Sequence, residues 1–497
     1  MKKHLRDWRA TAVTISTLCF VVSGCQDASS PAANVLAASS STAKQEFPDD
    51  GVSIASNSWM ALPSLITPRL GHAAVSLGGC VWAIGGSASL MGTPLSSVER
   101  YCPTIDATRW SASAPLPEAR ADFAGVGVIA NKIYAAGGVN ASGAATRSLY
   151  VYSAATGWSQ SPDSLPLPMQ CGGGGAVVGG KLYVFAGEFV DPGDCSTAAG
   201  RTLAVYNPAK TTPPRWTILP VAPVDAQFHC FFAMATLSGM LHFVGGGSCG
   251  ESLPSNAHYA FNITQARWVP ATFRYSLVGG TNYPAAVTLR SRIFFSGGIN
   301  GDLWYDPENE SWSYDPSTGS TDPLPPLRTF RSRHAVAALG NKLIVVGGRD
   351  EWSGPVTGSV EQLTVVTGCD IHEPDANKAN ATPWPMLMDG GGQPLVTPMT
   401  QAKICSASDV DNFLLVDVSR STSYLGFTVH MTPPAGKDYE LLLMDSTGTT
   451  VLQRSSLVGS VMETVRVPDP GTGFFIRVRS QDGTFSAGAP YRLEVVP

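Results

Sequence analysis

The chain has little charge and lacks the common catalytic signatures. Only 14% of its 497 residues are Asp, Glu, Lys or Arg, and the net charge is −5. No basic cluster follows the N-terminal region, which argues against nucleic acid as a partner. There is no His-Glu-x-x-His zinc motif, and the glycine run after Cys171 lacks the Gly-Lys-Ser/Thr end of a phosphate-binding loop. High Gly (51) and Pro (37) instead indicate a turn-rich all-β protein.

No apolar run is long enough to serve comfortably as a membrane-spanning helix, the longest at the N-terminus being Ala10 to Val22. Four basic residues precede that run, which predicts an export signal over residues 1–25. The segment Val22-Ser-Gly-Cys25 resembles the lipobox of bacterial lipoproteins. The resemblance implies acylation of Cys25, and Gln26 after it implies the outer membrane of a Gram-negative cell envelope. A plain secretory signal is the alternative. Residues 26–57, rich in Ser and Ala, predict a flexible tether.

A repeated phrase dominates the region 58–368. An apolar strand ends in a doublet of small residues six times, at steps of 52, 49, 59, 52 and 50 residues. The doublets are Gly85-Gly86, Gly137-Gly138, Ala186-Gly187, Gly245-Gly246, Gly297-Gly298 and Gly347-Gly348. A period near 50 indicates radial repetition, in which each unit completes its core against its neighbours. Small residues at the doublet are expected because a larger side chain would clash with the next unit.

Each repeat contains four short strands, and most end in a tyrosine or phenylalanine, a turn and a tryptophan. Examples are Tyr101 with Trp110, Tyr206-Asn-Pro208 with Trp216, and Tyr305-Asp-Pro307 with Trp312. These features resemble the kelch motif, which implies a six-bladed β-propeller with tryptophans packed between blades. The sixth copy has no tryptophan after Leu363, whereas Trp59 stands before the first copy. We therefore expect the leading strand to join the last blade and close the ring.

The last 129 residues, 369–497, have a different pattern. Alternating strands with aromatic ends predict a small β-sandwich after the propeller. The region resembles the bacterial pre-peptidase C-terminal domain, although Glu440 and Met444 depart from its usual residues. No cofactor is expected. Five acids are of the kind that binds calcium, but turn capping and solvated surface acid are the favoured interpretation of them. They are Asp370, Glu373, Asp375, Asp409 and Asp411.

Ten cysteines are present, of which Cys19 leaves with the signal and Cys25 takes the lipid. The remaining eight in an oxidising compartment predict four disulfides. Strand order suggests the pairs Cys80–Cys102, Cys171–Cys195, Cys230–Cys249 and Cys369–Cys405.

Loops that lead into the inner strands, and loops that follow the doublets, share one face of the predicted propeller. Kelch propellers generally bind ligands over this face. The residues expected to bind the ligand are Arg69, Arg120, Glu188, Asn282, Arg333, Arg349 and Asp350. His72 and Asp122 lie on the same face. Arg69 and Arg331 both lie sixteen residues before a doublet, and His72 and His334 thirteen before. Such matched positions favour a role in the fold over ligand binding.

The favoured function is a lipid-anchored, monomeric recognition protein that binds a carbohydrate or a protein. The alternative is a sugar-modifying enzyme such as a sialate-type epimerase or mutarotase, which needs an acid and a base across the axis. The pattern Gly246-Gly-Ser248-Cys-Gly250 matches the serine-hydrolase elbow, but it follows a blade strand and no helix is expected after it.

Overall fold

The structure is a computed structural model. It describes residues 52–496 except 56–57, 91, 170–174, 186–200, 224–229, 248–257, 270–283, 300–308, 317–318, 351–353, 368–370, 372–380, 387–398, 404–408, 418–426, 468–473, 484–485 and 487–489. The described residues form strands and turns, and no helix among them is long and apolar enough to cross a membrane.

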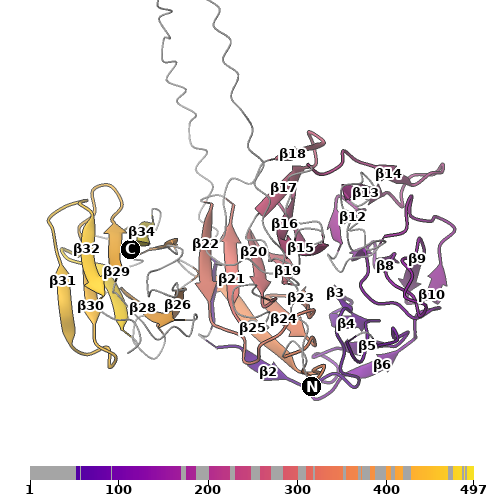
Figure 1. Ribbon diagram of the computed structural model, residues 1–497, viewed down its shortest axis with the longest axis horizontal. Helices are drawn as coiled ribbons and strands as arrows, with labels where there is room; N and C mark the ends of the chain where they lie inside the picture. Colours follow the sequence, from indigo (N-terminus) through magenta and orange to yellow (C-terminus); the bar gives the residue numbers. More distant parts are fainter. Residues whose placement is uncertain are drawn as a thin grey trace, which may run out of the picture. The chain divides into compact units, whose positions relative to one another are not determined.

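Six antiparallel sheets of the propeller follow one another in chain order (Figure 1). Blade one has β3 (Ala73–Leu77), β4 (Cys80–Ile84), β5 (Val98–Tyr101) and β6 (Ser111–Ser113); blade two has β7 (Gly125–Ile129), β8 (Lys132–Ala136), β9 (Leu149–Ser153) and β10 (Gly157–Gln160). Blade three has β11 (Ala176–Val178), β12 (Lys181–Phe185), β13 (Leu203–Tyr206) and β14 (Trp216–Ile218); blade four has β15 (Cys230–Leu237), β16 (Met240–Gly247), β17 (His258–Asn262) and β18 (Arg267–Val269). Blade five has β19 (Ala285–Leu289), β20 (Arg292–Ser296), β21 (Ser311–Asp315) and β22 (Ser320–Leu324); blade six has β23 (Ala335–Leu339), β24 (Lys342–Val346) and β25 (Val360–Thr367).

The leading segment completes blade six, which confirms the predicted closure. Strand β2 (Met60–Leu62) pairs antiparallel with β25, with Ala61 opposite Glu361. A further strand, β1 (Val52–Ile54), pairs with the end of β25 at Val365 to Thr367. All three residues of β1 are buried, so the ordered propeller begins six residues before the expected boundary, inside the segment expected to be a tether. The first and last parts of the propeller are thus joined in one sheet, and this leaves no open edge between them.

Trp59 occupies the position that the other blades give to their own tryptophan. Its indole Nε1 donates a hydrogen bond to the carbonyl of Pro325, 2.8 Å away, at the end of the preceding blade. Trp110 makes the same contact with Pro63 at 2.9 Å, and Trp268 with Pro220 at 2.8 Å. Trp59 is buried beside Leu327 and Val365. The tryptophan missing after blade six is therefore supplied from the start of the chain.

Blade five differs from the predicted pattern. Trp312 lies in the third strand, β21, where it is opposite Phe295, and not in the outer strand. The outer strand is β22. It follows Tyr314-Asp-Pro316, which provides the tyrosine and the turn of this blade. The segment around Tyr305 lies outside the described residues.

The doublets have the tight packing that the repeat predicted. Gly85 has a φ of +62°, and a Cβ built on it would lie 2.3 Å from the Arg120 carbonyl of the next blade. A Cβ on Gly347 would lie 2.6 Å from the Arg69 carbonyl, again in the next blade around the ring. Even alanine would force the blades apart at these positions, and its φ there would be strained.

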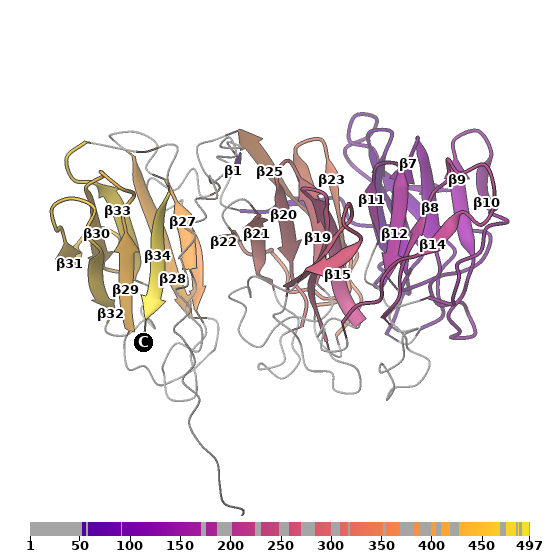
Figure 2. The same ribbon diagram turned by 90° about the horizontal axis from the view of Figure 1, so that it is seen from above.

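The C-terminal region forms two further sheets around one core (Figure 2). One sheet has the order β26-β28-β33-β30-β31 and the other β27-β34-β29-β32. The strands are β26 (Thr382–Met386), β27 (Met399–Ala402), β28 (Val410–Asp417), β29 (Phe427–Thr432), β30 (Tyr439–Met444), β31 (Val451–Ser455), β32 (Glu463–Val467), β33 (Phe475–Ser480) and β34 (Tyr491–Val496). Alternate residues such as Val429, Leu441 and Val478 face the core between the sheets, which makes this a β-sandwich as expected.

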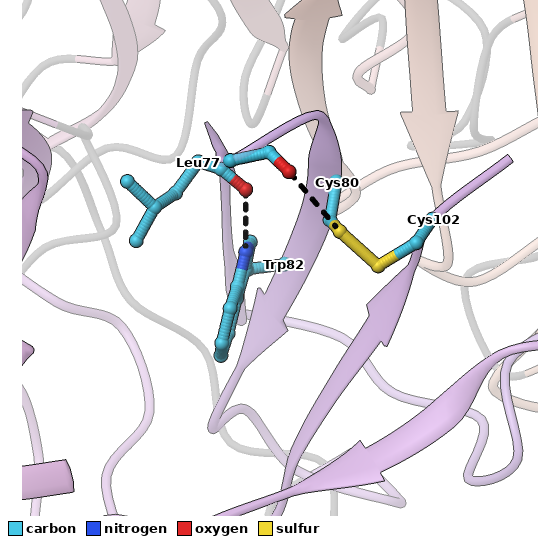
Figure 3. Close-up of a disulfide and its surroundings, with 5 residues drawn as sticks. Leu77, Cys80, Trp82 and Cys102 are labelled. Atoms are coloured by element: carbon cyan, nitrogen blue, oxygen red, sulfur yellow. Dashed lines mark hydrogen bonds between the residues drawn. A yellow bond between two sulfur atoms is a disulfide. The ribbon is translucent and has the colours of Figure 1, made fainter. Parts of the chain in front are cut away.

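One predicted disulfide is confirmed. Cys80 on β4 and Cys102, just after β5, are bonded with their Cα atoms 4.2 Å apart (Figure 3). Beside them, the Trp82 indole donates a hydrogen bond to the Leu77 carbonyl at 3.1 Å. The other three predicted pairs involve side chains outside the described part of the chain.

Candidate functional site

A cavity of about 370 Å³ lies on the propeller axis, and residues of the inner strands of all six blades line it. Its wall is made of small residues such as Ala74, Gly127, Ala235, Ala286 and Ala337. The inner strands approach closely: a Cβ on Gly127 of β7 would lie 2.4 Å from Val177 Cγ2 on β11, the inner strand of the next blade. Six strands meeting at one axis therefore explain why the inner strands are short of bulky residues.

Among the described lining residues, charged groups lie only at the end of the cavity where the loops lead into the inner strands. Gly71, Asp122 and Arg333 occupy the same position in blades one, two and six, two residues after a buried arginine. Arg333 Nη2 donates to both carboxylate oxygens of Asp122, at 2.8 and 2.7 Å. The pair crosses blade one and is partly exposed, with side-chain exposures of 16% and 24%.

Gly71 makes this bridge across blade one possible. A Cβ at Gly71 would lie 2.5 Å from Asp122 Oδ1 and 3.5 Å from Arg333 Nη2. The three residues also share a left-handed backbone, with φ of +60°, +48° and +52°. Gly71 N–H donates to the Arg333 carbonyl and its own carbonyl accepts from Asp122 N–H, at 2.9 and 2.8 Å. Backbone and side-chain bonds together hold the acid and the guanidinium at the cavity mouth.

Arg69 and Arg331, the two arginines at matched positions, are fully buried and make matched contacts. Arg69 forms an ion pair with Glu99 and donates to the Gly85 and Ser97 carbonyls at 2.8 and 3.0 Å. Arg331 pairs in the same way with Glu361 and donates to the Gly347 carbonyl at 2.9 Å.

Each carboxylate also accepts from the loop before its arginine, for example from Arg328 N–H to Glu361 at 2.7 Å. Burial lowers the pKa of Arg331, and the charge of Glu361 partly offsets this effect. These contacts tie each doublet to the loops around it, which is the role in the fold that matched positions suggested for this pair.

Arg120 and Arg349 are also buried, each about 1% exposed. Tyr150 takes the place of the glutamate in blade two, so Arg120 lies over its ring and pairs instead with Glu118 at 2.8 Å. Arg349 Nε lies 3.4 Å from Ser332 Oγ. Neither arginine lines the cavity, and binding of a ligand by Arg69, Arg120 or Arg349 stays a prediction.

The other predicted ligand residues have mixed positions. Arg333 lines the cavity mouth, whereas Asp350 lies near Arg331 and outside the cavity lining. Glu188 and Asn282 fall outside the described residues. Asp411 is buried in the C-terminal domain and accepts a hydrogen bond from the Tyr491 hydroxyl, while Asp409 caps Val410 N–H at 2.9 Å. Asp370, Glu373 and Asp375 are not described, and the described residues contain no group of three or more metal-ligating side chains.

Four histidines in the described part of the propeller are buried. His72 and His334 line the cavity at matched positions, and burial together with nearby arginines lowers the pKa of His72 to about 3 and also lowers that of His334. His242 and His258 stack on each other, with Nδ1 of the first 2.8 Å from Nε2 of the second. Burial lowers their pKa values to about 4 and about 3. All four are therefore neutral at physiological pH.

Comparison with known proteins supports the repeat interpretation directly. Residues 123–348 match the KLHDC2/KLHL20/DRC7 Kelch-repeats domain, and residues 68–117 and 331–369 match the Kelch motif. These matches cover blades one to six. The propeller is a kelch propeller.

Known proteins with kelch names are similar to parts of this chain. The chain is 27% identical to Kelch-like protein terF of Aspergillus terreus over 253 residues, which cover 48% of this chain and 53% of that protein. It is 22% identical to Kelch domain-containing protein 3 of Rattus norvegicus over 332 residues, 61% of this chain and 83% of the relative. It spans 34% of the F-box/kelch-repeat protein SKIP30 of Arabidopsis thaliana. Thus the chain covers about half or less of the length of two of these relatives.

Among solved structures, the one titled "Structure of YjhT" aligns with 61% of this chain and 99% of its own length. Its sequence identity to this chain is 18% and the TM-score is 0.48.

Proposed function

We propose that this chain is a recognition protein of the cell envelope whose kelch propeller binds a carbohydrate or protein ligand at the mouth of the axial cavity. The observation that carries the proposal is the Arg333–Asp122 pair, which is held over Gly71 at one end of the cavity. These two are the charged residues, Asp or Arg, among the described residues that line the cavity. A guanidinium with a partly exposed edge suits recognition of a carboxylate or of sugar hydroxyls. Kelch repeats generally mediate binding to proteins or other ligands, which supports the same reading.

Location forms the second part of the proposal. The basic N-terminal residues, the short apolar run and the lipobox-like Val22–Cys25 support export and acylation of Cys25. The Cys80–Cys102 disulfide supports an oxidising compartment for the propeller. Gln26 favours the outer membrane as the place of anchoring.

The binding function is favoured over sugar epimerisation by the lining of the cavity. Epimerisation needs an acid and a base that face each other. Among the described lining residues Asp122 is the single carboxylate, and it is paired with Arg333; the lining histidines have strongly lowered pKa values. The described part of the site thus suits holding a ligand better than moving a proton.

Arg333→Ala is expected to weaken ligand binding at least tenfold, because a hydrogen bond to a charged group contributes about 1.5–3 kcal/mol. A glycan and peptide array would first identify a ligand, and calorimetry would then compare affinities. Arg267→Ala is the matched control, since Arg267 is an exposed arginine on the outer strand of blade four that bonds Gln265. Equal affinities for both variants would contradict binding at the mouth, and turnover of a sugar acid would favour the enzyme.

A further inference from the structure

Exposed apolar side chains are concentrated at one edge of the C-terminal domain. Thirteen large apolar residues of the described chain are strongly exposed, and six of them lie between positions 451 and 462. Four belong to the loop between β31 and β32, here called the apolar loop: Leu457 (50% exposed), Val458 (82%), Val461 (49%) and Met462 (48%). The other seven are scattered over the propeller and its leading segment. A group of exposed aliphatic side chains on one loop indicates an interaction surface.

The apolar loop is held in place by polar contacts at its base. Glu463 is fully buried and accepts a hydrogen bond from Leu457 N–H at 2.6 Å. Ser460 Oγ accepts from Gly436 N–H at 2.6 Å and donates to the Pro434 carbonyl at 3.0 Å. With its backbone fixed in this way, the loop keeps Val458 turned to solvent. The exposure is therefore built into the fold.

The two strands that carry the apolar loop are each the edge of a sheet and lie side by side (Figures 1 and 2). Side chains of β31 bond the backbone of β32: Arg466 N–H donates to Gln453 Oε1 at 2.9 Å, and Thr464 N–H to Ser455 Oγ at 3.1 Å. These contacts occupy donors of β32 that an added strand would need. Strand addition to β32 is therefore a poor explanation of the exposed residues.

The exposed charges closest to the base of the apolar loop are cationic. Arg466 is exposed on β32, and Arg454 on β31 has a 53% exposed side chain. The acids of this region are less accessible: Glu463 and Glu440 are buried, and Glu440 is shared by Arg454 and Arg479. Lys437 and its neighbour Asp438, of opposite charge, are both half-buried. Aliphatic residues at the tip with cations behind them are the pattern of an interfacial membrane contact.

We propose that the apolar loop docks on a lipid surface that carries anionic headgroups. Leu457, Val458, Val461 and Met462 enter the boundary between headgroups and acyl chains, and Arg454 and Arg466 face the headgroups. A second copy of the chain fits less well, because a two-fold contact between apolar loops would bring the same cations of both copies together. The proposal uses the proposed envelope location for the presence of a bilayer, but it is independent of what the propeller binds.

The test compares variants of the full chain in a Cys25→Ser background, which removes the expected acylation. Binding to vesicles of phosphatidylethanolamine and phosphatidylglycerol is measured by co-sedimentation. Val458→Asp is expected to lower the partition coefficient about tenfold or more, since it removes an apolar contact and adds a charge of the wrong sign. Ile105→Asp is the matched control, because Ile105 is an aliphatic residue of 81% exposure in blade one. The control should change binding less than about twofold.

A second variant tests the charge. Arg466→Glu should weaken binding to the anionic vesicles and leave weak binding to phosphatidylcholine vesicles unchanged. Equal partition of the Val458→Asp and Ile105→Asp proteins would overturn the proposal. A concentration-dependent dimer that Val458→Asp abolishes would overturn it in favour of a second copy. The two proposals can fail separately. If the protein binds vesicles but the propeller binds no ligand, the proposed function fails while this inference stands.

Discussion

Trp59→Ala is expected to lower the free energy of unfolding of the propeller by about 3–5 kcal/mol, the usual cost of truncating a buried tryptophan. Trp59 is 2% exposed and packs against Leu324, Leu327 and Val365, which belong to blades five and six. Its loss leaves a cavity at the seam where the chain closes on itself, and also leaves the Pro325 carbonyl without its indole donor. Denaturant unfolding followed by fluorescence, together with thermal unfolding in a calorimeter, would measure the change.

Two further substitutions, one at Trp59 itself and one at the next residue, serve as controls for Trp59→Ala. Trp59→Phe keeps most of the ring and removes the hydrogen bond, so its cost should be near 1 kcal/mol plus the smaller loss of contact. Met60→Ala alters the next residue, which is 56% exposed, and should change stability by less than about 1 kcal/mol. If Trp59→Ala destabilises the propeller no more than Met60→Ala, closure by the leading segment does not stabilise the ring as described.

Glu361→Gln is expected to destabilise the propeller by about 3–5 kcal/mol, because it leaves the buried charge of Arg331 without its counter-ion. Arg331 and Glu361 have side-chain exposures of 0% and 3%. Glu361 also accepts from Arg328 N–H and the Thr329 hydroxyl, so one carboxylate holds the whole loop that leads toward Arg333. Loss of the pair should therefore also weaken ligand binding at the mouth, through displacement of that loop.

Glu118→Gln provides the matched control for the ion pair. Glu118 pairs with the buried Arg120, but its own side chain is 49% exposed and water can replace it. The expected cost is therefore below about 1 kcal/mol. Thermal unfolding of the two variants would compare them, and equal destabilisation would show that burial does not set the strength of these pairs.

The repeat period predicted the six blades because each blade must pack against the next with the same small residues at the same place. Closure was predictable for a similar reason. Five repeats have a tryptophan after the doublet, the sixth repeat has none, and Trp59 stands before the first repeat without a repeat of its own. Strand β1 was not predictable, since Val52-Ser-Ile54 is a three-residue segment in a Ser- and Ala-rich region. It is fixed by pairing with Val365 to Thr367, more than 300 residues away in the chain.

Blade five shows how a local motif can mislead. Tyr305-Asp-Pro307 before Trp312 has the spacing of the other blades, but Tyr314-Asp-Pro316 repeats the phrase a few residues later. Pairing of Trp312 with Phe295 selects the second copy, and periodicity alone could not make this choice. The prediction failed because two registers had nearly the same sequence support.

The site was predictable in part. Sequence placed Arg333 and Asp122 on the loop face, but not their pairing, because 211 residues separate them and the closed ring brings them together. A signal was nevertheless present. Aligning the repeats on their arginines puts Gly71, Asp122 and Arg333 at one position. Around the closed ring, the blade with Gly71 lies between the blades with Arg333 and Asp122, and a glycine there leaves room for an ion pair between the two.

The most direct test of the closed ring is a cross-link between its ends. Met60 and Gln362 are opposite each other on β2 and β25. The double variant Met60→Cys and Gln362→Cys, oxidised and digested without reduction, should yield a disulfide-linked peptide that contains both positions, in a protein that remains monomeric. Recovery of both thiols free, or linkage only between separate chains, would contradict a propeller sealed by its own leading strand.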